Sequence, residues 1–113
     1  MSLYLCAFDG DIEIAGVVAG AYSTFAKFRD AIAGVAAVTG VNFPIFLDHS
    51  DADGAWTVEQ LGGLRRELAA MVQDEHVSRA VSSFSTPDEA PLLDALLNLA
   101  ELASVRKLPI QFQ

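Results

Sequence analysis

The sequence predicts a single α+β domain over residues 1–113, with a three- to four-stranded sheet packed by about three helices. Short apolar runs near both ends of the chain have the length of strands, and longer stretches between them repeat apolar residues with the period of a helix. The chain has 113 residues, of which 52% are hydrophobic. That is enough for one modest core and argues against disorder.

The first element expected is a strand over residues 3–8. Leu3 and Leu5 are apolar on one side of the alternation, and Tyr4 and Cys6 are largely apolar on the other. A strand of this kind is typically central and covered on both faces. The sequence Asp9-Gly10-Asp11 then indicates a turn.

Residues 12–20 can be read in two ways. As a strand they form a hairpin with residues 3–8, in which Gly16 and Gly20 suggest a bulge or bend. Otherwise a helical crossover would make residues 3–8 and 43–47 parallel strands. The crossover would bring two acidic stretches to the same end of the sheet, whereas the hairpin places them at opposite ends. These stretches are Asp9, Asp11 and Glu13, and Asp48, Asp51 and Asp53. We favour the hairpin.

A helix follows over residues 23–38, with Ser23 as its N-cap and Gly40 at its end. Its apolar face carries Phe25, Phe28, Ile32 and Val35. Residues 43–47 are predicted as a short strand. Because Pro44 has no backbone N–H to donate, that strand should lie at a sheet edge or begin after the proline.

The next helix begins after Thr57, with Gln60 completing a capping box. Trp56 and Leu61 occupy the positions of a hydrophobic staple, so Trp56 is interpreted first as a packing anchor. The apolar stripe of this helix is Leu61, Leu64, Leu68 and Val72.

Thr86 and Pro87 predict a short turn over residues 87–90, and the last helix is expected over residues 91–106. Ile110 and Phe112 alternate with polar residues, so the chain is expected to finish as a strand.

The central stretch DHSDADGAWTVEQ, residues 48–60, can be aligned with the twelve-residue calcium-binding loop of EF-hands. With Gly54 at the sixth position, Asp51 and Asp53 fall on ligand positions, but His49 and Gln60 stand where oxygen-rich Asp and Glu are required. A register beginning at Asp48 fails at other positions. We therefore predict no metal site and no cofactor. Asp51 and Asp53 are the residues that an ion would use.

Fifteen acidic and seven basic residues give a net charge of −8. This charge argues against nucleic acid as a partner, because such binding depends on neutralising phosphates. It favours a basic partner, although it also serves simple solubility.

Apolar runs fall short of the roughly 20 residues of a membrane helix, and no secretion signal is recognised. The single Cys6 fits a reducing compartment, so a cytoplasmic location is expected.

Motifs of hydrolases, nucleotide-binding enzymes and zinc proteases are absent from the sequence, and we predict that the protein is not an enzyme. Three stretches remain to be placed: the start SLYLCAFDGDIEIAGV, the centre HSDADGAWTVEQ and the end PLLDALLNLAELASVRKLPIQFQ. In these stretches the chain resembles the bacterial immunity protein 70 family. The resemblance implies an α+β protein that binds and neutralises a cognate bacterial toxin without catalysis.

From the charge and the resemblance together we expect a partner-binding surface built from the two acidic stretches and the neighbouring tryptophan. Its candidate residues are Asp9, Asp11, Glu13, Asp48, Asp51, Asp53 and Trp56. Two alternatives are a calcium-responsive module and a structural domain that forms homo-oligomers through its leucine-rich last helix.

Overall fold

The computed structural model of the protein describes residues 2–49 and 54–113. It contains a four-stranded antiparallel sheet with the strand order β2-β1-β4-β3. The strands are β1 (Ser2–Asp9), β2 (Ile12–Ala21), β3 (Ala55–Trp56) and β4 (Ile110–Phe112). The α+β class predicted from the sequence is confirmed.

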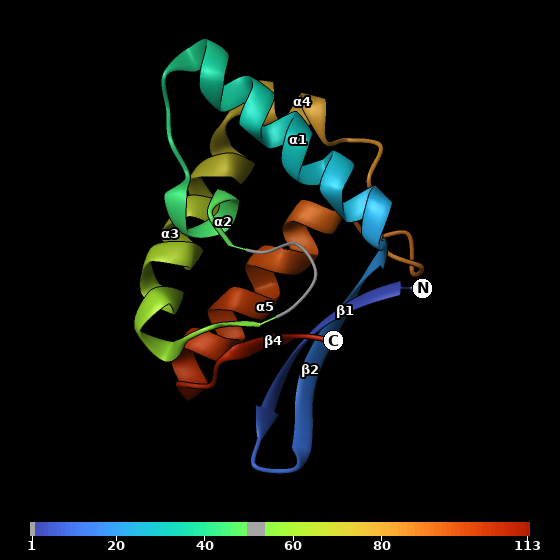
Figure 1. Cartoon of the computed structure of the whole chain (residues 1–113), viewed down its shortest axis with the longest axis vertical. Helices are drawn as coiled ribbons and strands as arrows, with labels where there is room; N and C mark the ends of the chain where they lie inside the picture. The colour runs from blue at the N-terminus through green and yellow to red at the C-terminus, as the bar shows by residue number, and fades with distance from the viewer. Residues whose placement is uncertain (1, 50–53) are drawn as a thin grey trace.

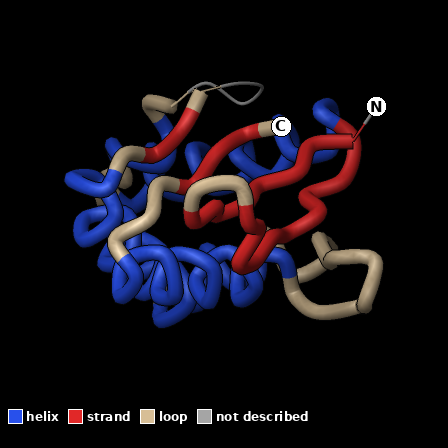
Figure 2. Tube along the Cα trace, turned by 90° about the horizontal axis from the view of Figure 1, so that it is seen from below, coloured by secondary structure: helices blue, strands red, loops and turns tan. Residues whose placement is uncertain are grey.

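Five helices pack with this sheet (Figure 1). They are α1 (Tyr22–Thr39), α2 (Pro44–Leu47), α3 (Val58–Gln73), α4 (Glu75–Ala80) and α5 (Leu92–Arg106). Three of them are long, as expected, and α2 and α4 are each less than two turns. Figure 2 shows the strands running next to one another on one side of the helices.

The core lies between the sheet and the helices. Leu3 and Leu5 of β1 are fully buried in one cluster with the apolar stripes of α3 and α5. Aromatic rings fill the centre of the cluster, with Phe25, Phe28, Phe46, Trp56 and Phe112 in mutual ring contacts. These contacts join α1, α2, β3 and β4, elements far apart in the sequence.

Residues 12–20 do form a hairpin with β1, so the favoured alternative holds. The pairing changes register between Leu3 and Tyr4 and again between Ala7 and Phe8. Such irregularities increase the local twist of a strand pair.

The β1–β2 turn is separated along the sheet from Gly54, which precedes β3. Phe112 pairs with Leu5 and donates its backbone N–H to the carbonyl of Gly54 at 2.9 Å, so Gly54 lies across β4 at the level of Leu5. β1 continues from Leu5 to Asp9 before the turn begins. Asp51 and Asp53 lie outside the described residues, so the separation of the two acidic stretches stays a prediction.

The first helix begins earlier than expected. Its N-cap is Ala21, which has no side-chain cap, so the prediction of Ser23 as the cap is wrong. The helix follows β2 without a loop, and tertiary packing of Phe25 and Phe28 fixes its start in place of a polar cap. Gly40 ends it in a left-handed conformation, as predicted.

Residues 43–47 were predicted as a strand, and this is wrong. They form the short helix α2, with Pro44 at its first turn. Proline is favoured at that position because its fixed φ suits the helix and its missing N–H is not needed there. A short apolar run does not distinguish a strand from a buried helical turn.

The starts of α3 and α5 lie close to the positions predicted from the sequence. The capping box of Thr57 and Gln60 is present, with the Thr57 N–H donating to Gln60 Oε1 at 3.0 Å. A turn occupies residues 87–89, and α5 begins directly after Pro91.

Candidate interaction surfaces

The turn between β1 and β2 is the more clearly presented of the two acidic stretches. Asp9, Asp11 and Glu13 are all exposed, and the side chain of Ile12 between them is 68% exposed. The first basic residue of the chain is Lys27, which lies in α1 beyond the hairpin. The hairpin thus carries negative charge with no cation of its own.

Glu13 is held in place by Tyr4. The Tyr4 hydroxyl donates to Glu13 Oε2 at 2.9 Å. A Cβ atom added at Gly16 would lie 2.1 Å from the Tyr4 hydroxyl oxygen and 2.4 Å from the ring carbon that carries it. The ring therefore crosses β2 directly over Gly16, which explains why glycine occupies the middle of this strand.

This hydrogen bond raises the pKa of Tyr4, and partial burial and the negative charge of Glu13 raise it further. Each of these influences favours the neutral phenol over the phenolate.

The second acidic stretch is only partly placed. Asp48 is exposed, immediately after α2. Asp51 and Asp53 lie outside the described residues. Trp56 is 2% exposed, so its inclusion among residues that contact a partner is wrong, while its interpretation as a packing anchor is confirmed. A buried aromatic side chain contributes to stability because it removes a large apolar area from water.

The position of Asp48 depends on how α2 is anchored. The Glu67 carboxylate of α3 accepts hydrogen bonds from the backbone N–H groups of Ile45 and Phe46, at 3.0 and 2.9 Å. At the other end, Trp56 Nε1 donates to the Ile45 carbonyl at 3.1 Å, and the Arg29 guanidinium donates to the Leu47 carbonyl. A four-residue helix is unstable alone, so these contacts hold it.

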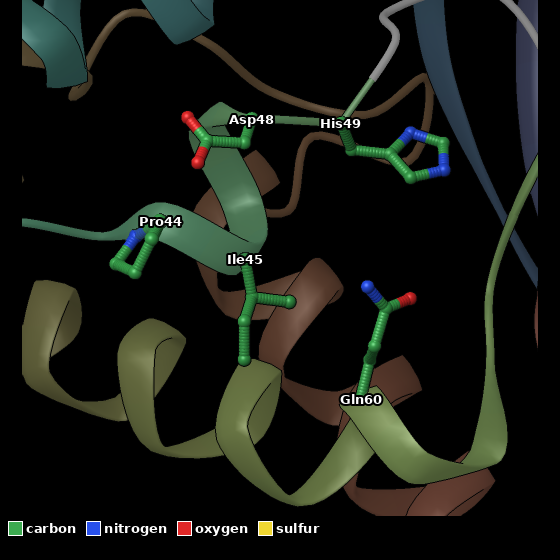
Figure 3. Close-up of a pocket in the computed structure, with 5 residues that line it drawn as sticks. All are labelled: Pro44, Ile45, Asp48, His49 and Gln60. Carbon is green, nitrogen blue, oxygen red and sulfur yellow. The ribbon is translucent and has the colours of Figure 1, made fainter.

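A shallow pocket of about 280 Å³ lies beside α2, lined by Pro44, Ile45, Asp48, His49 and Gln60. Figure 3 shows that its polar side chains do not converge: the Asp48 carboxylate and the His49 ring point in different directions, and Gln60 approaches from α3. Gln60 is already engaged by the helix cap. Among the described residues that line the pocket, no two side chains are paired as the acid and base of a proton transfer.

His49 is half-buried and packs against the aromatic core. Its ring stacks on Phe112 with centroids 4.3 Å apart, and its Nε2 lies 3.0 Å from the Ala55 carbonyl oxygen, a hydrogen-bonding distance. Among residues 2–49 and 54–113, no three His, Cys, Asp or Glu side chains gather in a way that could hold a metal ion.

Cys6 is fully buried, and burial raises the pKa of its thiol, with a further contribution from the charge of Glu13. A buried thiol with a raised pKa is a poor nucleophile at neutral pH. It acts as a small apolar side chain in the sheet.

A groove that the sequence did not predict runs along β2. Its larger part, about 480 Å³, lies between β2 with Tyr4 and the turn after Thr86. Its smaller part, about 280 Å³, lies between β2 and α5. The two parts share Gly16, Val17 and Ala95 and are therefore continuous. The only sequence signal was Gly16, a glycine inside a predicted strand.

Comparison of the chain with protein-family models, with curated proteins and with solved structures found no match. None of the helices within the described part of the chain has the length and apolar character needed to cross a membrane.

Proposed function

We propose that this protein is a non-enzymatic immunity protein of the cytoplasm, which binds a cognate bacterial toxin and neutralises it. The toxin surface that it recognises is basic. The proposal combines the resemblance of the sequence to the immunity protein 70 family with the acidic character of the chain, and it assigns binding rather than catalysis to the exposed carboxylates.

The observation that carries the proposal is the acidic hairpin turn. Three carboxylates and the exposed Ile12 project together at one end of the sheet, and no Lys or Arg occurs before Lys27. Negative potential of this kind steers a basic partner towards its docking position. An apolar side chain among the charges adds area that binding removes from water.

A toxin that cleaves nucleic acid or binds phosphates has a basic surface, because it must neutralise phosphate charge. An acidic protein that occupies that surface competes with the substrate directly. The acidic stretch after α2, with Asp48, Asp51 and Asp53, is the second contact region of this proposal.

The test measures association of the purified protein with the toxin encoded beside it. Asp11→Lys should slow association about ten-fold at low salt, because it reverses one charge at the tip of the hairpin. Asp30→Lys is the matched control, since Asp30 is also exposed but lies on α1. An Asp11→Lys variant that associates as fast as the control would remove the hairpin from the interface.

The second region is tested in parallel by the double variant Asp51→Lys and Asp53→Lys. An unchanged association rate constant at low salt would remove this stretch from the interface. Failure of the unmodified protein to bind or inhibit the toxin would end the proposal itself.

A further inference from the structure

Within residues 2–49 and 54–113, no strand pairs with the outer edge of β2. In the strand order β2-β1-β4-β3, β2 pairs only with β1, and it is the longest strand of the sheet, at 10 residues. The opposite edge strand, β3, has only 2 residues. An edge strand presents backbone N–H and C=O groups that can pair with another extended chain.

Proteins usually protect such an edge with lysine, proline, a covering loop or irregular pairing. β2 contains neither lysine nor proline. The features of β2 that limit unwanted pairing with other chains are its two changes of register and the charge of Glu13. Instead of being closed off by helix or loop, the edge borders the groove formed with α5 and the turn after Thr86.

The shape of this groove suits an added strand. One wall is β2 itself, and the other is provided by Pro87 and Asp88 of the turn and by Asn98 and Leu102 of α5. A peptide lying between an edge strand and a helix gains main-chain hydrogen bonds from the strand and side-chain contacts from the helix.

The charge around the groove specifies the occupant. Residues 1–26 and 80–105 include the β1–β2 hairpin, the turn and all of α5 except its last residue, Arg106, and they contain no Lys or Arg. All the charged side chains in these two segments are acidic: Asp9, Asp11, Glu13, Asp88, Glu89, Asp94 and Glu101. The seven basic residues lie elsewhere, in residues 27–79 and at 106–107.

We infer that the groove along β2 binds an extended segment of the partner protein that carries Lys or Arg, which adds to the sheet as a fifth strand beside β2. This inference rests on the proposed function and locates the contact more finely, since it assigns the toxin's docking segment to the groove. A second copy of this chain fits less well, because its β2 carries Glu13 and no Lys or Arg, so it offers no cation to the acidic groove.

The first experiment uses a peptide in place of the toxin. A capped peptide of about eight residues with alternating Lys and Val has the length of a typical strand. Titrated into the isotope-labelled protein, it should shift the amide signals of β2, of residues 86–90 and of the first half of α5. Two control peptides replace Lys by Glu, or replace alternate Val residues by Pro, and each should bind about ten-fold more weakly or worse.

The Pro-containing peptide keeps the charge but cannot complete a ladder of hydrogen bonds. Equal binding of this peptide would overturn strand addition, as would amide shifts centred outside the groove. A concentration-dependent dimer in sedimentation, with the same amides perturbed, would assign the edge to a second copy and likewise overturn the inference.

The second experiment uses the toxin complex. The double variant Asp88→Lys and Asn98→Lys adds charge and bulk to the wall of the groove at two exposed positions. Its matched control, Asp30→Lys with Gln73→Lys, makes the same change in net charge at exposed sites away from the groove. We expect the groove variant to bind the toxin about ten-fold more weakly than the control.

The results separate the two proposals. If the toxin is neutralised and both double variants bind it equally, the groove is excluded while the immunity function stands. If the Lys peptide seats along β2 but the toxin is not bound, the groove stands and the immunity function fails. Circular dichroism and melting of each variant establish that the comparison is made between folded proteins.

Discussion

Tyr4 and Gly16 form a matched pair across the hairpin. The aromatic ring takes the space above the glycine that a Cβ atom would fill, and the hydroxyl reaches Glu13 beyond it. Glycine weakens a strand because it has no side chain to pack, and an aromatic neighbour lying over it restores that packing. The same contact fixes one of the carboxylates of the acidic turn.

The ionisation of Tyr4 should reveal this contact. Its pKa lies above the ordinary value of 10.0, chiefly because of the hydrogen bond to Glu13. The folded protein holds this proton at pH values where the unfolded chain begins to release it. The resulting stabilisation is complete below the unfolded-state pKa and is lost as the pH rises through the folded-state pKa.

Replacing Glu13→Ala should therefore lower the pKa of Tyr4 towards its ordinary value. Ultraviolet absorbance of the phenolate measures the titration, and a Tyr22→Phe background isolates Tyr4, since the chain has only two tyrosines. An identical titration curve with and without Glu13 would show that the hydrogen bond does not form in solution.

Among the elements, α2 shows most clearly how tertiary contacts decide local structure. Four residues cannot form a stable helix by themselves. Glu67 satisfies two N–H groups at the beginning of α2, while Trp56 and Arg29 satisfy carbonyls at its end. These three partners come from α3, β3 and α1, so α2 is hydrogen-bonded to two helices and one strand.

Substituting Glu67→Ala should lower the free energy of unfolding by about 2 kcal/mol, because it removes two hydrogen bonds made by a charged acceptor to partly buried N–H groups. Chemical denaturation measures the change. Glu59→Ala, an exposed position in the first turn of α3, is the control and should cost about 0.5 kcal/mol. Equal losses would mean that Glu67 does not anchor α2.

The adjacent glycines of α3 provide a second test at this scale. A Cβ at Gly62 would meet only Arg66 Nη1 at 3.8 Å, whereas a Cβ at Gly63 would lie 2.3 Å from Ile45 Cδ1. Gly63 thus allows α2 to pack close to α3, while Gly62 leaves room for a side chain.

We therefore expect Gly62→Ala to raise the free energy of unfolding by about 1 kcal/mol, the difference in helix propensity between the two residues. Gly63→Ala should gain less or lose stability, because the Ile45 side chain must move to make room. Thermal and chemical unfolding of the two variants side by side measures the difference. Equal gains in the free energy of unfolding would show that the packing of the Ile45 side chain does not require glycine at position 63.

For the whole molecule, the uneven placement of charge matters more than its total. The charged side chains of the hairpin, of the turn and of α5 up to Val105 are all acidic, whereas all the cations lie in residues 27–79 and at 106–107. This asymmetry gives the groove side of the protein the stronger negative potential.

Association with a basic toxin should consequently depend on salt. We expect the association rate constant to fall by about ten-fold from low salt to physiological ionic strength, because screening shortens the range of steering. The dissociation rate constant should change much less. Stopped-flow mixing at several salt concentrations measures both, and a salt-independent association rate would show that charge does not guide the encounter.

Much of the fold was predictable because its signals are local. The alternation in residues 3–8, the periodic leucines of α3 and α5, the capping box at Thr57 and the terminating Gly40 all led to the elements observed. The errors arose where a long-range contact decides the outcome. Residues 43–47 form a helix because Glu67 and Trp56 hold them, and neither partner can be recognised from the apolar run itself.

The sequence by itself determined the α+β class, the acidic character and the exposed turn after Asp9, since these follow from local periodicity, turn chemistry and composition. Only the tertiary structure decided that Trp56 is buried and that β2 is an open edge beside a groove. The physical reason is that strand order and burial depend on which distant segments pair, and such pairing is a property of the packed chain as a whole.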